Sequence, residues 1–279
     1  MLNFGFVLAE TVAGLMSHSL ALLADAGHNL SDVLSLLLAW GATVLAKRAP
    51  SARRTYGLRK ATILASLTNA VLLLVAVGVI ASESVRRLME PVSVATLPVA
   101  ITAAVGVVIN TATALMFMRG HDDLNVRGAF LHMASDAAVS LAVVAGAVLM
   151  MLTGGLGWLD PALSLLISVV IVLGTWGLLR DSVDMALDAA PRGIDVAAVR
   201  RWLGEQPGVT DVHDLHIWAM STTETALTVH LTRPANDDGD AFLHATCESL
   251  AKRFGIGHCT LQVETGDAGD CRLSPAHIV

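Results

Sequence analysis

Charged, aromatic and cysteine residues are scarce in this chain of 279 residues. Asp, Glu, Lys and Arg make up 15% of it and aromatic residues 4%, whereas hydrophobic residues make up 54%. A soluble domain usually has about 25% charged residues, so the composition excludes an ordinary soluble protein of this length. The three cysteines form no Cys-x-x-Cys pair. That pattern argues against a disulfide framework and favours a reducing compartment.

The few charges are spread unevenly along the chain. From residue 189 onward there are twelve Asp or Glu and seven Lys or Arg, which is the composition of a small, acidic, water-soluble domain. An acidic domain repels phosphate backbones, which excludes nucleic acid as a partner, and it is compatible with cations. We therefore predict a transmembrane domain over 1–188 and a separate C-terminal domain over 189–279.

Apolar stretches before residue 189 are long enough to cross a bilayer, which takes about 20 residues each. They lie at 20–46, 61–82, 94–118, 129–151 and 159–180. A sixth stretch, at 2–16, is shorter and has neither a basic segment nor an Ala-x-Ala cleavage site, so it does not resemble a signal peptide. We interpret it as a transmembrane helix truncated at its start. The membrane domain is predicted to have six helices.

Basic residues determine the predicted orientation. The 47–60 loop, KRAPSARRTYGLRK, carries six Lys or Arg, while the loops on the opposite side hold only Arg86 and Arg87. Cytoplasmic loops carry an excess of Lys and Arg. We therefore predict that the basic loops and the C-terminal domain are cytoplasmic, in a multi-pass protein of the bacterial inner membrane.

The C-terminal domain has its own periodicity. Helices are predicted at 194–208 and 238–255, and strands at 209–220, 224–233 and 257–265. The order αββαβ predicts an α+β domain with helices on one face of a small sheet. The predicted fold class is an α-helical membrane protein with this small α+β domain at its C-terminus.

Two His-x-x-x-Asp pairs stand inside the apolar stretches. ADAGHNLSDVLSL at 24–36 holds His28 and Asp32, and AFLHMASDAAVSL at 129–141 holds His132 and Asp136. Residues four apart share one face of a helix. Ionisable groups in a membrane helix cost roughly 2.5–3.5 kcal/mol and usually mark a pathway or relay. One pair could be structural, but two pairs supply two imidazole nitrogens and two carboxylate oxygens, a set that tetrahedral Zn²⁺ accepts.

This ligand set favours transport over permanent binding. Imidazole binds a metal only when it is neutral, and its ordinary pKa of about 6.5 lets it exchange protons near neutral pH. Arrival of a metal ion must therefore release protons, and arrival of protons must loosen the metal. A site without a sulfur ligand can also release its ion readily.

These motifs, together with PRGIDVAAVRRWL at 191–203 and GVTDVHDLHIWAM at 208–220, resemble the cation diffusion facilitator family. The resemblance is strongest to the zinc-exporting branch and covers nearly the whole chain. It implies a homodimer of six-helix protomers that exchanges cytoplasmic Zn²⁺ for protons. It also implies a ferredoxin-like or metallochaperone-like cytoplasmic domain for metal binding and dimerisation.

The resemblance also assigns roles to residues. The family's transport site matches His28, Asp32, His132 and Asp136. A histidine at the first of these positions points towards zinc, because members with aspartate there accept cadmium or iron more readily. A lysine–acid contact of the family matches Lys60 and Asp188, although Lys60 could equally be a basic anchor at the membrane surface.

Zinc is implied a second time, as a ligand of the cytoplasmic domain. The matching positions are His213, His230 and Glu264, with His258 and Cys271 as further candidates. His213 and His230 fall on neighbouring predicted strands and can face each other, whereas odd spacing places His216 on the opposite face from His213.

Two other function classes were weighed against a secondary transporter. A zinc hydrolase needs three protein ligands, an activated water and a general base. The sequence shows no HExxH or GxSxG motif, and we recognised no third acid beside the two pairs. A membrane-anchored metal sensor without transport is the remaining alternative, but it needs no ligands inside the helices. The pairs suit Zn²⁺, Cd²⁺ and Co²⁺ alike. The expected partners are thus a metal cation, protons, the lipid bilayer and a second copy of the chain.

Overall fold

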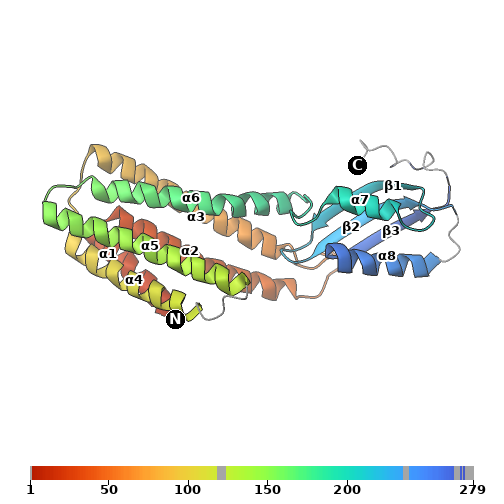
Figure 1. The fold of residues 1–279 in the computed structure, drawn as a ribbon, viewed down its shortest axis with the longest axis horizontal. Helices are drawn as coiled ribbons and strands as arrows, with labels where there is room; N and C mark the ends of the chain where they lie inside the picture. Colours follow the sequence, from red (N-terminus) through yellow and green to blue (C-terminus); the bar gives the residue numbers. More distant parts are fainter. Residues whose placement is uncertain (1, 118–123, 235–238, 267–270, 272, 274–279) are drawn as a thin grey trace. The chain divides into compact units, whose positions relative to one another are not determined.

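The computed structural model describes residues 2–117, 124–234, 239–266, 271 and 273 (Figure 1). The helices before residue 189 are α1 (Leu2–Ser17), α2 (Leu20–Ala46), α3 (Ala61–Met89), α4 (Thr96–Phe117), α5 (Leu124–Thr153) and α6 (Leu159–Ala186). In the described part of the chain, five of these are long and apolar enough to cross a membrane, and α1 is a shorter apolar helix.

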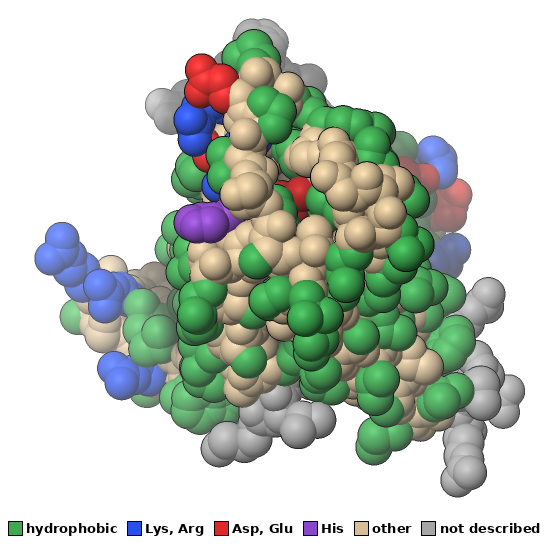
Figure 2. Space-filling view, turned by 90° about the vertical axis from the view of Figure 1, so that its left-hand side faces the viewer, with side chains coloured by type: hydrophobic (Ala, Val, Ile, Leu, Met, Phe, Trp, Pro, Cys, Tyr) green, Lys and Arg blue, Asp and Glu red, His purple; other side chains and the backbone are tan. Residues whose placement is uncertain are grey.

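The helices expose large apolar side chains. Leu36, Trp40, Val79, Val108 and Leu173 are between 66% and 72% exposed. Figure 2, which looks at the left-hand end of Figure 1, shows many hydrophobic side chains at the surface and charged side chains in only a few small groups. Water does not tolerate apolar patches of this extent on a monomer, whereas lipid tails do. The chain is an integral, multi-pass membrane protein, as the sequence predicted.

Small residues and buried polar contacts join the helices to one another. Ala24, Ala103 and Ala147 are almost fully buried in the core of the helical region, where small side chains allow close helix packing. Asp160 of α6 accepts hydrogen bonds from the Ser19 hydroxyl at 2.5 Å and from the Leu20 amide at 2.8 Å. This carboxylate caps the N-terminus of α2, whose first amides have no partner within the helix.

The described chain forms two compact units. One contains residues 1–38 and 68–177, and the other contains 39–67 and 178–279. Helices α2, α3 and α6 therefore each contribute residues to both units. Helices α3 and α6 also continue past the predicted spans to Met89 and Ala186, because hydropathy marks only the apolar part of a helix and not its charged ends.

The C-terminal domain contains α7 (Val196–Gly204), β1 (Asp211–Ala219), β2 (Thr225–Thr232), α8 (Gly239–Phe254) and β3 (Ile256–Glu264), which confirms the order αββαβ. Strand β2 is central, antiparallel to β1 and parallel to β3. Leu227 and Leu231 of β2 are fully buried with Leu203 of α7 and Leu250 of α8. Both helices therefore pack on one face of the sheet, and the other face is left for polar side chains.

One cysteine pair departs from the prediction. A disulfide joins Cys247 of α8 to Cys259 of β3, with their Cα atoms 6.1 Å apart. The expectation of no disulfide framework rested on spacing along the chain, which does not show that this pair of cysteines comes together. Helix α8 packs on the sheet beside β3, and this packing brings together two cysteines that are 12 residues apart.

Candidate metal centre

The two His-x-x-x-Asp pairs lie next to each other. His28 Nε2 is 3.3 Å from Asp136 Oδ1 and 3.9 Å from Asp32 Oδ2. His132 Nε2 is 3.2 Å from Asp32 Oδ2 and 3.7 Å from Asp136 Oδ2. Helices α2 and α5 thus bring together four side chains that are about a hundred residues apart, in a ring that alternates imidazole and carboxylate.

The spacing of these atoms suits a small cation. One ligand atom from each of the four residues lies within 4.8 Å of all the others. A tetrahedral Zn²⁺ with ligands at about 2.0 Å would hold neighbouring ligand atoms about 3.3 Å apart. The contacts of 3.2 and 3.3 Å between the helices match this value, and those within each helix are slightly longer. Because the four ligand atoms are bounded only by 4.8 Å, the ring would have to contract to hold a zinc ion at all four positions.

Burial differs around the ring. The Asp136 side chain is 3% exposed, whereas those of Asp32 and His132 are 37% and 44% exposed. Asp136 Oδ2 is buried without a hydrogen-bond partner among the described residues. Leaving a buried acceptor unpaired is costly. A cation would relieve this cost, and the more exposed side of the ring offers it a route of entry.

A second cluster lies on the open face of the C-terminal sheet. His213 of β1 pairs directly with His230 of β2 in the antiparallel ladder, and their ring centroids are 5.4 Å apart. Glu264 at the end of β3 places Oε2 3.3 Å from His213 Nε2 and Oε1 3.1 Å from His230 Nδ1. Cys271 Sγ lies 3.5 Å from His230 Nδ1. The ligand atoms of these four residues again lie within 4.8 Å of one another.

Neighbouring acids orient the two histidines. The Asp211 carboxylate lies 2.9 Å from His213 Nδ1, which leaves Nε2 facing Glu264. Asp214 lies 3.6 Å from His230 Nε2, on the side away from Glu264. Carboxylates in this position commonly fix the tautomer of a metal-binding histidine. Two nitrogens, a carboxylate oxygen and a sulfur form a ligand set that Zn²⁺ accepts.

The acid and the thiol in this cluster have shifted pKa values. Desolvation is the largest single influence on Glu264 and opposes ionisation, but hydrogen bonds from Cys271 and Gln262 and the two imidazoles together lower its pKa. A backbone hydrogen bond from Leu273 favours the Cys271 thiolate, yet desolvation and the nearby acids raise the pKa of this thiol. Glu264 is therefore ready to bind a cation, whereas Cys271 must first lose a proton.

Two histidines of the same domain lie elsewhere. A β-bulge between His213 and His216, with Asp214 at φ 49°, inserts one extra residue into β1, and His216 pairs with Thr228. The prediction that His216 faces away from His213 is therefore wrong, because the bulge reverses the alternation. His216 pairs with Asp214 at 2.9 Å and is not part of the cluster. His258 is also absent from it and instead contacts the Tyr56 ring.

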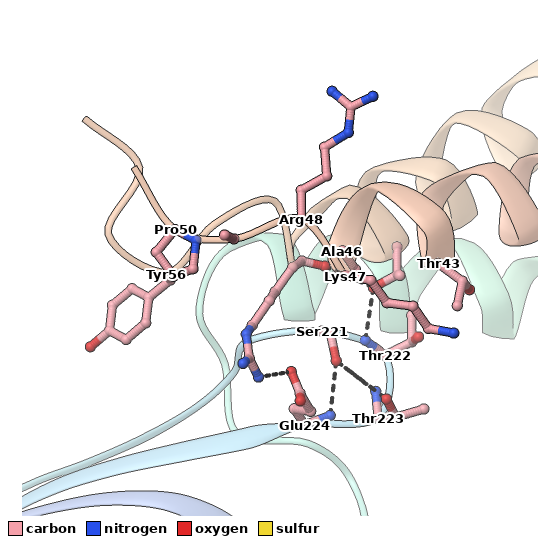
Figure 3. Close-up of a pocket in the computed structure, with 13 residues that line it drawn as sticks. Thr43, Ala46, Lys47, Arg48, Pro50, Tyr56, Ser221, Thr222, Thr223 and Glu224 are labelled. Carbon is pink, nitrogen blue, oxygen red and sulfur yellow. Dashed lines mark hydrogen bonds and ion pairs between the residues drawn. The ribbon is translucent and has the colours of Figure 1, made fainter. Parts of the chain in front are cut away.

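Lys60 and Asp188 are in contact, with Nζ 2.6 Å from Oδ1. In the same unit, Arg59 forms an ion pair with Glu224, and the Thr222 amide donates to the Thr62 hydroxyl at 3.1 Å. The turn at 221–224 between β1 and β2 thus touches the start of α3. Figure 3 shows this turn beside a pocket of about 450 Å³ at the C-terminal end of α2.

Sequence reasoning missed several acids near the clusters. Glu10 of α1 and Asp25 of α2 are fully buried in the helical unit. Asp25 is thus a third acid near the pairs, one helical turn before His28, and it was not predicted from the sequence. Asp211 and Asp214 were also missed. The signal for Glu10 and Asp25 was present, because each is an ionisable residue inside an apolar stretch.

Comparison with known proteins gives consistent matches along the chain. The family model for the cation efflux transmembrane domain matches residues 1–186, and the model for the cation efflux protein cytoplasmic domain matches residues 191–266. The cation efflux system protein CzcD of Alcaligenes sp. (strain CT14) is 36% identical over 261 residues, which cover 93% of this chain and 82% of that protein.

Two further relatives have more specific names. The zinc transporter ZitB of Escherichia coli (strain K12) is 36% identical over 277 residues, covering 97% of this chain and 87% of that protein. The cadmium, cobalt and zinc/H(+)-K(+) antiporter of Bacillus velezensis (strain DSM 23117 / BGSC 10A6 / LMG 26770 / FZB42) is 33% identical over 269 residues, covering 94% of this chain and 85% of that protein.

Proposed function

The chain belongs to the cation efflux, or cation diffusion facilitator, family, and on this premise we propose that it exports Zn²⁺ from the cytoplasm in exchange for protons. As a member of this family it is a metal efflux transporter and not an enzyme. The proposal adds the metal, the counter-ion and the residues. The transport site would consist of His28, Asp32, His132 and Asp136.

One observation carries this proposal. Four ligand atoms from two separate helices lie within 4.8 Å of one another in the membrane part of the chain. Nitrogen and oxygen donors without sulfur suit Zn²⁺ that must be bound and then released. The name of the ZitB relative supports zinc, and the name of the antiporter relative adds cadmium, cobalt and protons.

Proton exchange follows from the same ligands. Each imidazole must be neutral to bind the cation, so protons and metal compete for His28 and His132. On the cytoplasmic side, a zinc ion displaces these protons and is held by two nitrogens and two carboxylates. On the other side, protons return to the imidazoles and reduce the affinity for zinc.

The C-terminal domain would bind zinc without transporting it. We assign His213, His230 and Glu264 as its ligands, with Cys271 as the fourth ligand and without His258. We further propose a division at residue 188, a cytoplasmic location for 189–279, and a homodimer in the bacterial inner membrane. The description of the matching family, a cytoplasmic domain, supports the location.

A flux assay tests the transport site. The full chain is reconstituted into vesicles with an imposed proton gradient, and zinc movement and internal pH are followed with indicator dyes. Asp136→Ala should abolish flux, because it removes a ligand that is 3% exposed and leaves the two imidazoles with one acid. Losing a residue that only positions a ligand already costs about 10–100-fold in affinity.

The matched control is Asp184→Ala, which removes an exposed carboxylate at the end of α6 and should transport normally. Flux at the wild-type rate in Asp136→Ala would refute the site. A wild-type chain that binds zinc but moves none across the vesicle membrane would favour the sensor alternative.

A further inference from the structure

Helices α1 and α2 bury two carboxyl groups that the transport site does not use. Glu10 and Asp25 are both 0% exposed. The Asn29 amide donates to Glu10 Oε2 at 3.2 Å, and the Ser140 hydroxyl of α5 donates to Asp25 Oδ2 at 2.8 Å. Each acid thus has one oxygen held by a neutral donor.

The remaining oxygens, Glu10 Oε1 and Asp25 Oδ1, are buried and have no donor among the described residues. The two carboxyl groups are also close enough for each to influence the charge of the other. An ionised carboxylate is costly to bury without a cation, so the full burial of both groups and their unpartnered oxygens favour a proton on one of them. Two adjacent buried carboxylates would not both stay ionised.

Among the described residues, no Lys or Arg acts on either carboxyl group. Helices α1, α2 and α4 contain no Lys or Arg, and Glu10 is the only ionisable residue of α1. The ionisable groups that act on Asp25, apart from Glu10, are His28 and Asp136. Gly106 of α4 packs against the same place, where an added Cβ would lie 3.2 Å from the Ser140 hydroxyl. A mobile proton is therefore what can neutralise the negative charge of these two carboxyl groups.

The pair is next to the transport site on both helices that build it. Asp25 precedes His28 by three residues on α2, and Ser140 follows Asp136 by four residues on α5. One turn of helix rises about 5.4 Å. A divalent cation among the four ligands would therefore repel a proton on the pair strongly, because the medium between them screens charge poorly.

We propose that Glu10 and Asp25 form a proton-binding site that shares one proton when the transport site holds no metal and releases it when a divalent cation binds there. The proton leaves as H⁺ from the oxygen that carries it, and both carboxylates then remain ionised beside the cation. This inference rests on the proposed function, because it requires a cation at His28 and its partners. The Glu10–Asp25 pair would be a second site, besides the imidazoles of His28 and His132, at which metal binding releases a proton.

Infrared difference spectroscopy of the purified full chain tests the proton directly. Metal-free protein should show the C=O stretch of a protonated carboxyl group, and addition of Zn²⁺ should remove it. Glu10→Gln should lack this zinc-sensitive band. The control Glu83→Gln, at a partly exposed ion pair with Arg86 and Arg87, should keep it. A wild-type spectrum without the band, or a band that persists in both Glu10→Gln and Asp25→Asn, would overturn the proposal.

Calorimetry in buffers of different ionisation heat counts the protons released per bound zinc. Glu10→Gln should release one fewer than wild type, and an equal count would refute the coupling. Ser140→Ala is a milder variant, should Glu10→Gln fail to fold. It removes the donor to Asp25 and should shift the frequency of the band, and an unshifted band would contradict the assignment.

A set of carboxylate, amide and hydroxyl oxygens could also hold a hard cation instead of a proton. In that case the band would be absent, and K⁺ or a second divalent ion would bind to wild type but not to Glu10→Gln, which overturns the proton assignment. Failure of wild-type zinc flux in vesicles would refute the proposed function, whereas the band in metal-free protein does not depend on flux.

Discussion

Replacing Asp188 by glycine should leave the stability of the protein nearly unchanged, whereas replacing it by alanine should lower it. Asp188 follows the end of α6 with a φ of 61°, in the left-handed region. The Ala189 amide donates to the Asp184 carbonyl at 2.9 Å, which closes the helix end in the way that a glycine usually does. The same residue forms the contact with Lys60.

The two contributions are of similar size and opposite sign. A left-handed conformation costs a residue with a side chain about 1 kcal/mol, and glycine avoids this cost. An ion pair whose partners are half exposed, as Lys60 and Asp188 are, contributes about 0.2–1 kcal/mol. Asp188→Gly removes the cost of the left-handed conformation but also removes the ion pair, so the net change in the free energy of unfolding is close to zero. Asp188→Ala loses the pair and keeps the strain.

Thermal unfolding of the purified full chain in one detergent measures the difference. We expect Asp188→Ala to unfold about 2–4 °C below Asp188→Gly, from the usual relation between free energy and melting temperature at this size. In a Lys60→Ala background there is no pair to lose, and Asp188→Gly should then stabilise the protein. Equal destabilisation by glycine and alanine would refute the reasoning, because it would mean that the left-handed conformation of residue 188 carries no strain for glycine to relieve. A stable Asp188→Gly variant would also isolate the effect of the contact on zinc flux.

Two other substitutions probe the metal clusters. His28→Asp should raise the ratio of cadmium to zinc flux, because it replaces an imidazole by an oxygen ligand; an unchanged ratio in the vesicle assay would mean that residue 28 does not contact the ion. Asp211→Asn should weaken zinc binding to the C-terminal domain by about 10–100-fold, because it removes the carboxylate 2.9 Å from His213 Nδ1. Titration of the full chain in an Asp136→Ala background, which silences the membrane site, measures this affinity, and wild-type affinity would contradict the orienting role.

The parts of the fold that depend on local periodicity were predictable from the sequence. Five spans follow from runs of apolar residues, and the αββαβ order follows from alternation and helix-ending residues such as Gly255. The His28–Asp32 and His132–Asp136 pairs were equally accessible, because residues four apart on a helix share a face whatever the rest of the fold does.

Contacts that depend on packing between elements were not predictable. The bulge beside Asp214 moves His216 to the opposite face of the sheet from the one predicted. No residue pattern in β1 indicates an extra residue in the ladder. Cys271 joins the cluster from beyond the last strand. The pairing of Glu10 with Asp25 depends on how α1 packs against α2, which hydropathy does not specify.

In the membrane site, the contacts within one helix and the contacts between helices have different consequences for transport. Within each helix, the histidine and aspartate are 3.9 and 3.7 Å apart, and both come from positions that share one face of the helix. Between the helices, the contacts are 3.3 and 3.2 Å, and only the packing of α2 against α5 determines them. Zinc affinity then depends on the one distance that helix movement can change. A small separation of α2 from α5 would break two contacts at once and would leave each His-x-x-x-Asp pair intact to take up protons.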